Sequence, residues 1–219
     1  MRRFHPAAVL FDMDGLLIDS ERIAQEVTRE ASLHLGFALP ESIALRMIGL
    51  SRDALERMLV AALSADFPFE RFQTEWETRY HQRIAKGVPI KAGVAEALAA
   101  LAAAGLPCAV ATSTHTDFAR YKLKQAGLLT QIAVVVGRDA VPQGKPAPDL
   151  YLHAAKQLGI PAHLCWAFED SLPGLMAAVA SGARTHWVPD LAQIAAHELP
   201  DGVETVASLH EVCRWVAHG

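Results

Sequence analysis

Residues 8–15 read Ala8-Val9-Leu10-Phe11-Asp12-Met13-Asp14-Gly15, and this stretch decides the interpretation of the whole chain. Four apolar residues, enough for one buried strand, end at two carboxylates that stand one residue apart. Side chains at positions i and i+2 of an extended segment point the same way, so the two negative charges crowd together. Like charges this close repel each other unless a proton or a cation lies between them. The stretch therefore predicts a strand end that holds Mg²⁺, a hard cation that prefers carboxylate oxygens.

The bulk composition is that of a soluble globular protein and excludes several functional classes. The chain has 219 residues, of which 52% are hydrophobic and 20% are charged, with a formal net charge of −4 at pH 7. There is no basic field for nucleic acid and no apolar run long enough to span a bilayer. The three cysteines form no CxxC pair, and too few apolar residues separate Arg2-Arg3 from Asp12 for a signal peptide. We therefore expect a cytoplasmic protein that binds neither nucleic acid nor a membrane.

Residues 19–87 carry helical periodicity. Asp19-Ser20 and Ser51 are candidate helix N-caps, and apolar residues recur after each of them at helical spacing. An aromatic and apolar stripe follows, formed by Phe69, Phe72, Trp76, Tyr80 and Ile84. A stripe at this spacing is the buried face of a helix far more often than a cofactor site. The segment therefore predicts a small all-helical unit.

After Gly87 the pattern changes to strands that alternate with helices. Short apolar runs fall at residues 108–111, 132–136, 165–168 and 185–188. Strands that alternate with helices form parallel sheets with right-handed crossovers. We predict an α/β fold, with a Rossmann-like parallel sheet core domain at 1–18 and 88–219 and an inserted all-helical cap domain at 19–87. The cap begins just after the paired aspartates, so we expect it to open and close over them, with hinges near Ile18-Asp19 and Gly87-Val88.

Polar residues follow the predicted strands or lie in the adjacent loops. They are Asp12 and Asp14, Thr112-Ser113-Thr114, Lys145, and Glu169-Asp170. Each set has an ordinary explanation by itself, because hydroxyl side chains cap helices and lysines and acids are mostly exposed. In a parallel sheet, however, the carboxyl ends of the strands meet at one edge, where ligands bind. The joint arrival of these groups at that edge indicates a reaction site.

Phosphate chemistry accounts for this combination of residue types. Asp12 would be the nucleophile, and an aspartyl-phosphate on it would divide hydrolysis into two easier steps. A Mg²⁺ ion held by Asp12, Asp14 and Asp170 would neutralise the phosphate and the nucleophile together. Lys145 would offset the remaining negative charge, and the Thr112 hydroxyl would hold a phosphoryl oxygen. Asp14 would protonate the leaving oxygen and later activate water.

Four segments resemble the motifs of the haloacid dehalogenase (HAD) superfamily of phosphohydrolases. They are Phe11-Asp12-Met13-Asp14-Gly15-Leu16-Leu17-Ile18-Asp19-Ser20-Glu21, Ala111-Thr112-Ser113, Gly144-Lys145-Pro146-Ala147-Pro148-Asp149 and Phe168-Glu169-Asp170-Ser171, and their order and spacing match over the whole chain. The resemblance implies Asp12 as nucleophile and Asp14 as general acid and base, with Thr112 and Lys145 as phosphate ligands. It also implies a Mg²⁺ site made by the Asp12 side chain, the Asp14 main chain and Asp170, with Glu169 beside the metal.

Within the superfamily, the chain looks like the branch that contains β-phosphoglucomutase and small sugar-phosphate phosphatases. Gly49-Leu50-Ser51-Arg52 is similar to the cap segment that supplies a phosphate-binding arginine in the mutases, although a surface helix arginine explains Arg52 equally well. Ser113, Thr114 and Arg52 are therefore candidate substrate-binding residues. A histidine and a lysine of the mutase cap are replaced here by Ala24 and Trp76. A mutase must hold two phosphates in turn, so the missing groups favour simple hydrolysis.

Three functions compete at this point. The first is a Mg²⁺-dependent phosphatase for a small phosphorylated metabolite, for which we expect a sugar phosphate. The second is a phosphohexomutase of the β-phosphoglucomutase type. The third is a phospho-aspartate signalling receiver, which uses similar residues on a parallel sheet but is much shorter than this chain and needs an open site. The sequence does not name the substrate, and for the assembly we expect a monomer or a weak homo-oligomer.

Overall fold

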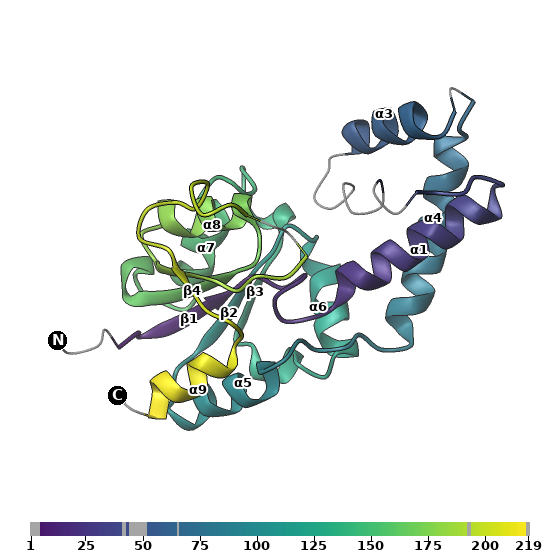
Figure 1. Cartoon of the computed structure of the whole chain (residues 1–219). Coiled ribbons are helices and arrows are strands. Elements are labelled where there is room, and N and C mark those ends of the chain that lie inside the picture. The colour runs from purple at the N-terminus through teal and green to yellow at the C-terminus, as the bar shows by residue number, and fades with distance from the viewer. Residues whose placement is uncertain (1–4, 41–42, 44–51, 65, 192–193, 218–219) are drawn as a thin grey trace. The chain divides into compact units, whose positions relative to one another are not determined.

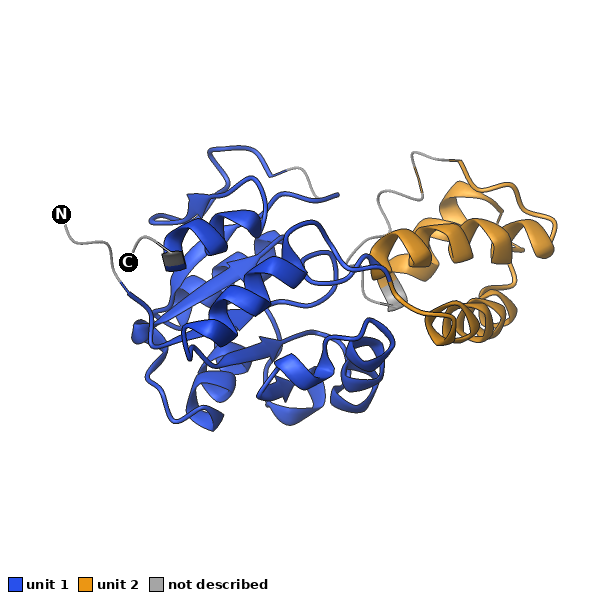
Figure 2. Cartoon of the chain, turned by 90° about the horizontal axis from the view of Figure 1, so that it is seen from below, with its two compact units in different colours: residues 1–19, 89–219 blue, residues 20–88 orange. Residues whose placement is uncertain are grey.

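The structure is a computed structural model that describes residues 5–40, 43, 52–64, 66–191 and 194–217. The chain divides into two compact units, which Figure 2 distinguishes by colour. Unit 1 consists of Met1–Asp19 and Pro89–Gly219, and unit 2 of Ser20–Val88. Within the described ranges, none of the helices combines the length and apolar character that a bilayer crossing requires.

Unit 1 is built on a sheet of six parallel strands in the order β3-β2-β1-β4-β5-β6 (Figure 1). The strands are β1 (Ala8–Phe11), β2 (Cys108–Ala111), β3 (Val134–Val136), β4 (Cys165–Glu169), β5 (Arg184–Trp187) and β6 (Glu204–Thr205). The two central strands, β1 and β4, are buried along their whole length, as continuous apolar runs predict. The sheet confirms the predicted α/β, Rossmann-like fold class.

Helices cover both faces of the sheet. The helices of unit 1 are α5 (Val94–Ala103), α6 (Thr116–Gln125), α7 (Asp149–Gln157), α8 (Leu172–Ala180) and α9 (His210–Ala217), with single 3₁₀ turns η1 (Leu129–Gln131), η2 (Arg138–Ala140) and η3 (Ala162–Leu164). Figure 1 shows α7 and α8 over one face, and α5 and α9 together on the other. Crossover helices on both faces are what an all-parallel sheet requires to bury its strands.

The two faces of the sheet carry different side chains. The face under α7 and α8 has small residues, including Ala8, Ala109, Ala111 and Ala167, so those helices lie close to the strands. On the opposite face Trp166 meets Trp215 of α9, with ring centroids 5.3 Å apart. Successive strand side chains alternate between faces, so Glu169, two positions after Ala167, falls on the side of α7. This alternation decides which helix can reach the end of β4.

Four strands differ from the sequence prediction, and the smallest change is in β4, which extends one residue past the predicted run to Glu169. The run at 132–136 predicts a five-residue strand, but β3 contains only Val134–Val136, because Ile132 ends the 3₁₀ turn η1. Strand β5 lies one residue earlier than predicted. Strand β6 was not predicted, since its two residues, Glu204 and Thr205, are exposed and give no apolar signal.

Among the described residues of unit 2, all regular secondary structure is helical. Its helices are α1 (Ser20–His34), α3 (Arg52–Ala62) and α4 (Phe69–Ala85). Four members of the predicted stripe, Phe69, Phe72, Tyr80 and Ile84, are buried, and Trp76 is half-buried against the same cluster. This confirms that the stripe is a packing face. The predicted cap Ser51 lies outside the described residues.

The two chain crossings at the edge of unit 1 pair with each other. The backbone N–H of Asp19 donates to the carbonyl of Pro89 at 2.8 Å, and that of Lys91 donates to Leu17 at 3.0 Å. Between these two bonds, Ile18 and Ile90 form an antiparallel bridge. The entry to and the exit from unit 2 are therefore held side by side by unit 1 itself.

Candidate active site

The site begins where the two central strands end. Phe11 of β1 pairs with Phe168 of β4, and the backbone N–H of Asp12 donates to the carbonyl of Phe168 at 3.0 Å. This register places Asp12 and Glu169 on neighbouring strands at the carboxyl edge of the sheet. Here the strand order reverses, because β2 lies on one side of β1 and β4 on the other. In open α/β sheets this reversal point is where ligands bind.

A buried lysine joins the two carboxylates. The Lys145 ammonium donates to Oδ1 of Asp12 and, at 2.5 Å, to Oε1 of Glu169. The side chains of Lys145, Asp12 and Glu169 are only 5%, 9% and 0% exposed. Charged groups are buried to this degree only when they are paired. The structure thus brings together three of the predicted site residues in direct contact.

Both oxygens of Glu169 are engaged by hydrogen-bond donors. Besides Lys145, Oε1 accepts from the hydroxyl of Tyr151 on α7 at 2.8 Å. The other oxygen, Oε2, accepts from the backbone N–H groups of Asp170 and Ser171 at 3.0 and 3.1 Å, and from the Ser171 hydroxyl at 3.0 Å. A carboxylate held by this many donors is fixed in orientation. Glu169 is therefore a rigid acceptor that fixes the Lys145 ammonium beside Asp12.

The start of α8 is shaped to receive this carboxylate. A Cβ atom added to Gly174 would lie 1.8 Å from Oε1 of Glu169, far inside contact distance, so only glycine leaves room for it. Ser171 is the N-cap residue, and its hydroxyl accepts from the N–H of Gly174. The positive end of a helix dipole also favours a carboxylate at this position. Local sequence and helix geometry together hold Glu169.

The pKa values of the buried groups follow from their surroundings. Burial, the largest cause, raises the pKa of Asp12 to about 8, with Lys145 opposing this and Glu169 adding to it. Burial alone would lower the pKa of Lys145, but the carboxylates of Asp12 and Glu169 raise it above its ordinary value. Burial and Glu169 raise the pKa of Tyr151, which keeps its hydroxyl a donor. Burial thus favours the protonated form of Asp12, and the Lys145 ammonium opposes this.

The acidic residues fit a hard divalent cation. Carboxylate oxygens of Asp12, Glu169 and Asp170 lie within 4.8 Å of one another, and all three residues are buried. Oxygen donors at this spacing suit Mg²⁺, and a cation here would restore the ionised form of Asp12 that burial disfavours. Since Glu169 already accepts five hydrogen bonds, Asp12 and Asp170 are the better ligands.

Asp14 has partners of its own. Gly15, with a φ of 87°, allows the chain to turn directly after it, and the N–H of Gly15 donates to Ile18 at 3.0 Å. The Lys122 ammonium lies 2.6 Å from Oδ1 of Asp14, and the Thr114 hydroxyl donates to Oδ2 at 2.7 Å. Both oxygens of Asp14 are thus held from the β2 side of the sheet. The predicted general acid and base therefore contacts Lys122 and Thr114 in the structure.

The remaining predicted residues have different surroundings. Thr112 is buried directly after β2, and its hydroxyl accepts from the N–H of Thr114 at 3.1 Å. Ser113 between them is exposed. Arg52 is the first residue of α3 in unit 2, while the segment before it, Gly49-Leu50-Ser51, lies outside the described residues. The structure thus brings together the predicted residues of unit 1, with the exception of Ser113, whose side chain is exposed to solvent.

The two positions that depart from the mutase pattern both lie in unit 2. The indole N–H of Trp76 donates to the Thr28 hydroxyl at 2.9 Å, and the ring stacks on Tyr80 with centroids 4.6 Å apart. That hydroxyl in turn donates to the carbonyl of Ala24 at 2.7 Å. Trp76 therefore serves the packing of α1 against α4, and Ala24 contributes a backbone acceptor within α1.

Sequence reasoning missed two residues of the site, Tyr151 and Lys122. Of the two, Lys122 had a weak sequence signal. Lys122 follows buried Ala119 by three positions and precedes buried Leu123, which places a lysine on the apolar face of its helix. Tyr151 gave no such signal, because its complete burial, which makes its hydroxyl seek a partner, is visible only in the structure. The partners themselves come from distant strands, which is why neither residue was tied to the site.

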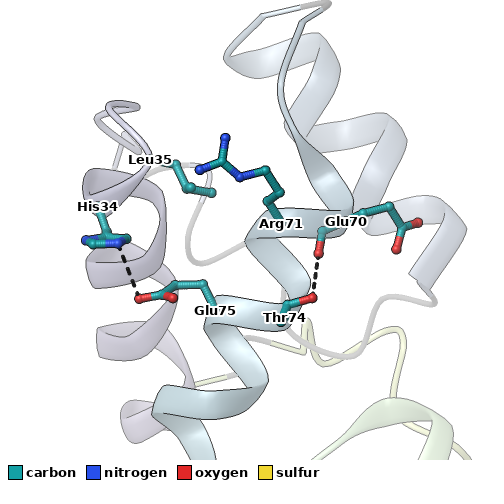
Figure 3. Close-up of a pocket in the computed structure, with 6 residues that line it drawn as sticks. All are labelled: His34, Leu35, Glu70, Arg71, Thr74 and Glu75. Carbon is teal, nitrogen blue, oxygen red and sulfur yellow. Dashed lines mark hydrogen bonds and ion pairs between the residues drawn. The ribbon is translucent and has the colours of Figure 1, made fainter.

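A cavity of about 350 Å³ opens on unit 2 alone, between the end of α1 and the start of α4 (Figure 3). It is lined by His34, Leu35, Glu70, Arg71, Thr74 and Glu75. Several of its polar groups are engaged with one another: His34 Nε2 lies 3.8 Å from Glu75 Oε1, and the Thr74 hydroxyl donates to the carbonyl of Glu70 at 3.0 Å. None of the predicted site residues lines it, so we assign it no catalytic role.

Comparison with known proteins decides the family. Residues 9–188 match the model of the haloacid dehalogenase-like hydrolases, and this range includes every site residue of unit 1 described above. The chain belongs to the haloacid dehalogenase-like hydrolases. The phosphorylated carbohydrates phosphatase of Thermotoga maritima is 32% identical over 178 residues, which cover 80% of this chain and 81% of that protein. The comparisons thus confirm the predicted enzyme class: this HAD-like chain is a phosphoric monoester hydrolase.

Solved structures agree with this assignment. A HAD family hydrolase from Deinococcus radiodurans with bound phosphate and sodium is 33% identical, with a TM-score of 0.83 over 99% of this chain and 97% of that one. β-Phosphoglucomutase from Clostridium difficile has a TM-score of 0.74 over 97% of this chain and 96% of that one. At 18% identity the second likeness shows the fold alone.

Proposed function

We propose that this HAD-like hydrolase is a Mg²⁺-dependent phosphatase that hydrolyses a small phosphorylated metabolite, a sugar phosphate, through an aspartyl-phosphate on Asp12. One observation carries the proposal: a buried aspartate at the reversal point of a parallel sheet contacts a buried lysine and lies within a cluster of carboxylates. The phosphatase from Thermotoga maritima, whose name gives phosphorylated carbohydrates as its substrates, supports the choice of substrate class.

In the first step, Oδ of Asp12 attacks phosphorus, and the bond between phosphorus and the ester oxygen breaks. The Asp14 carboxyl gives its proton to that oxygen, and the alcohol leaves. In the second step, Asp14 accepts a proton from water, which attacks phosphorus and releases inorganic phosphate and free Asp12. Each step forms and breaks one bond to phosphorus, so the enzyme returns to its starting state.

We assign the Mg²⁺ site to the carboxylates of Asp12 and Asp170 and to the main-chain carbonyl of Asp14. When bound, the cation supplies positive charge that lowers the repulsion between an anionic nucleophile and an anionic substrate. Glu169 is placed beside this site as the partner of Lys145 and Tyr151.

Lys145 and the residues after β2 would receive the phosphoryl group. The Lys145 ammonium is fixed by Glu169, so it can contact a phosphoryl oxygen without first losing conformational freedom. Thr112 and Ser113 offer hydroxyl and backbone N–H donors at the end of the neighbouring strand, whereas the Thr114 hydroxyl donates to Asp14. Arg52 remains a proposed substrate-binding residue of the cap, unit 2. The cytoplasmic location and the monomeric or weakly associated state remain predictions.

A phosphohexomutase is the alternative, and the fold shared with β-phosphoglucomutase keeps it in the test. A mutase needs cap groups that hold a second phosphate. Trp76 is instead engaged with Thr28 and Tyr80, and Ala24 has no polar side chain. Hydrolysis is therefore the better supported reaction.

The deciding experiment is a phosphate-release screen over sugar phosphates, nucleotides and phosphoglycolate, with Mg²⁺ or with a chelator. Asp12→Asn is the control, because the amide keeps the shape of Asp12 but is a poor nucleophile. We expect release that requires Mg²⁺ and disappears in the variant. Isomer formation that depends on a bisphosphate primer would instead identify a mutase. A long-lived phosphorylated Asp12 without turnover would identify a receiver.

A further inference from the structure

A second buried lysine lies beside the proposed acid and base. Lys122, on α6, is 5% exposed in its side chain, and its ammonium lies 2.6 Å from Oδ1 of Asp14. The Thr114 hydroxyl lies 2.7 Å from Oδ2 of the same carboxylate and 3.3 Å from the Lys122 ammonium. Asp14, Thr114 and Lys122 thus form a closed triangle of polar contacts. The triangle joins the loop after β1 to the segment after β2.

Packing alone does not explain a lysine at this position. Its neighbours on the helix, Ala119 and Leu123, are both buried and apolar, and an apolar side chain would fill the same space. Removing an ammonium from water costs free energy unless it is paired. The Lys122 ammonium lies over the Phe118 ring, with Nζ 5.2 Å from its centroid, and its charged partner is Asp14 at 2.6 Å. The charge is therefore directed at the carboxylate.

We propose that Lys122, together with Thr114, is a positioning residue that fixes the orientation of the Asp14 carboxyl for proton delivery to the leaving oxygen. The inference rests on the proposed phosphatase function. Lys122 acts only through Asp14 and does not contact the phosphoryl group. Two donors on two different oxygens fix both the position and the rotation of a carboxyl, whereas one donor would leave it free to turn. Proton transfer depends on such placement because the distance to the accepting oxygen must be that of a hydrogen bond.

Leaving groups of different basicity separate this role from a structural one. An alkyl phosphate, such as a sugar phosphate, needs a proton on its leaving oxygen, but p-nitrophenyl phosphate releases a stable phenolate without one. Loss of Asp14 placement must therefore slow the first substrate much more than the second. A general loosening of the site would slow both substrates equally.

The test compares Lys122→Met with Lys124→Met, a matched control that removes an exposed lysine from the same helix. We expect Lys122→Met to lower kcat for the best sugar phosphate about 30-fold and kcat for p-nitrophenyl phosphate less than about threefold, with KM nearly unchanged. Lys122→Arg, which keeps the charge and the donors, should recover kcat for the sugar phosphate to within about fivefold of wild type. Thr114→Val should show the same leaving-group bias as Lys122→Met, and it provides a second route should Lys122→Met fail to fold.

A double variant locates the effect. In an Asp14→Asn background, Lys122→Met should cause no further loss, because the carboxyl through which it acts is already gone. Equal losses for both substrates in Lys122→Met and Thr114→Val, or an additional loss in the double variant, would overturn the proposal. Failure of the proposed function gives a different result, since wild type would then release no phosphate or Asp12→Asn would retain activity.

Discussion

Among single residues, Tyr151 shows how a group outside the reaction controls one inside it. Its hydroxyl donates to the oxygen of Glu169 that also accepts from Lys145, and its ring lies 5.3 Å from the Lys145 ammonium. Tyr151→Phe keeps the ring and removes this one hydrogen bond. We expect stability to fall by about 1 kcal/mol and kcat by about tenfold, since Glu169 can then shift and carry the lysine with it.

Thermal unfolding and steady-state kinetics measure the two effects of Tyr151→Phe. Tyr121→Phe is the matched control, because Tyr121 is a half-buried tyrosine on α6 outside the site. A kcat for Tyr151→Phe equal to that of the control would show that backbone donors alone hold Glu169.

The raised pKa of Asp12 makes cation binding depend on pH. Burial raises the pKa of Asp12 to about 8, so below that pH we expect Mg²⁺ to displace a proton from its carboxyl. The affinity for Mg²⁺ should therefore rise with pH, by up to about tenfold per unit, and level off above pH 8. The sign follows from the direction of the shift: a carboxyl of ordinary pKa would already be ionised at pH 6 and would give no slope.

Calorimetry in buffers of different ionisation enthalpy tests this directly, because it counts the protons released. We expect close to one proton per Mg²⁺ near pH 6.5 and almost none at pH 9. Asp12→Asn has no proton to release at this position and serves as the control. Binding whose affinity stays constant from pH 6 to 9 would show that Asp12 is ionised before the cation arrives.

At the level of helices and strands, Gly174 is where two elements compete for the same space. The N-terminal turn of α8 can lie against the Glu169 carboxylate only because position 174 has no Cβ. Gly174→Ala should push Glu169 out of its place, with a loss of about 1–3 kcal/mol of stability from overpacking and a large loss of kcat.

Unfolding and kinetics of Gly174→Ala should be measured beside Met176→Ala, which changes an exposed residue of the same helix. Met176→Ala should leave both quantities near wild type. Since alanine favours helices over glycine, a stabilised and active Gly174→Ala would mean that α8 can move away from Glu169.

The sheet and the positions of most site residues could be predicted because each depends on a local pattern. An apolar run that ends at a carboxylate marks both a strand and its end, which is how Asp12 and Glu169 were found. Strand β6 lacked any such run, and β3 was shortened by a turn that its apolar residues do not reveal. The partners Tyr151–Glu169 and Lys122–Asp14 join segments 18 and 108 residues apart. Contacts of that kind depend on helix packing over the sheet, which no local pattern records.

In the whole molecule, the site residues and the ends of the insertion are concentrated in one of the two units. Every described site residue except Arg52 belongs to unit 1, and so do both paired crossings at 17–19 and 89–91. Unit 1 therefore holds the ends of its own insertion together without help from unit 2. Replacing Ser20–Val88 by a flexible linker of about four residues should close the chain at little cost, as in a hairpin.

We expect this shortened chain to unfold cooperatively and to bind Mg²⁺ with nearly the affinity of the full chain. Hydrolysis of the best sugar phosphate should fall by about 100-fold or more, because substrate positioning and exclusion of water are assigned to the cap. Hydrolysis of p-nitrophenyl phosphate should fall far less, and Asp12→Asn in the shortened chain should abolish it. Equal losses for both substrates would show that unit 2 acts on the chemical step itself, and a failure to bind Mg²⁺ would show that unit 1 does not form the metal site alone.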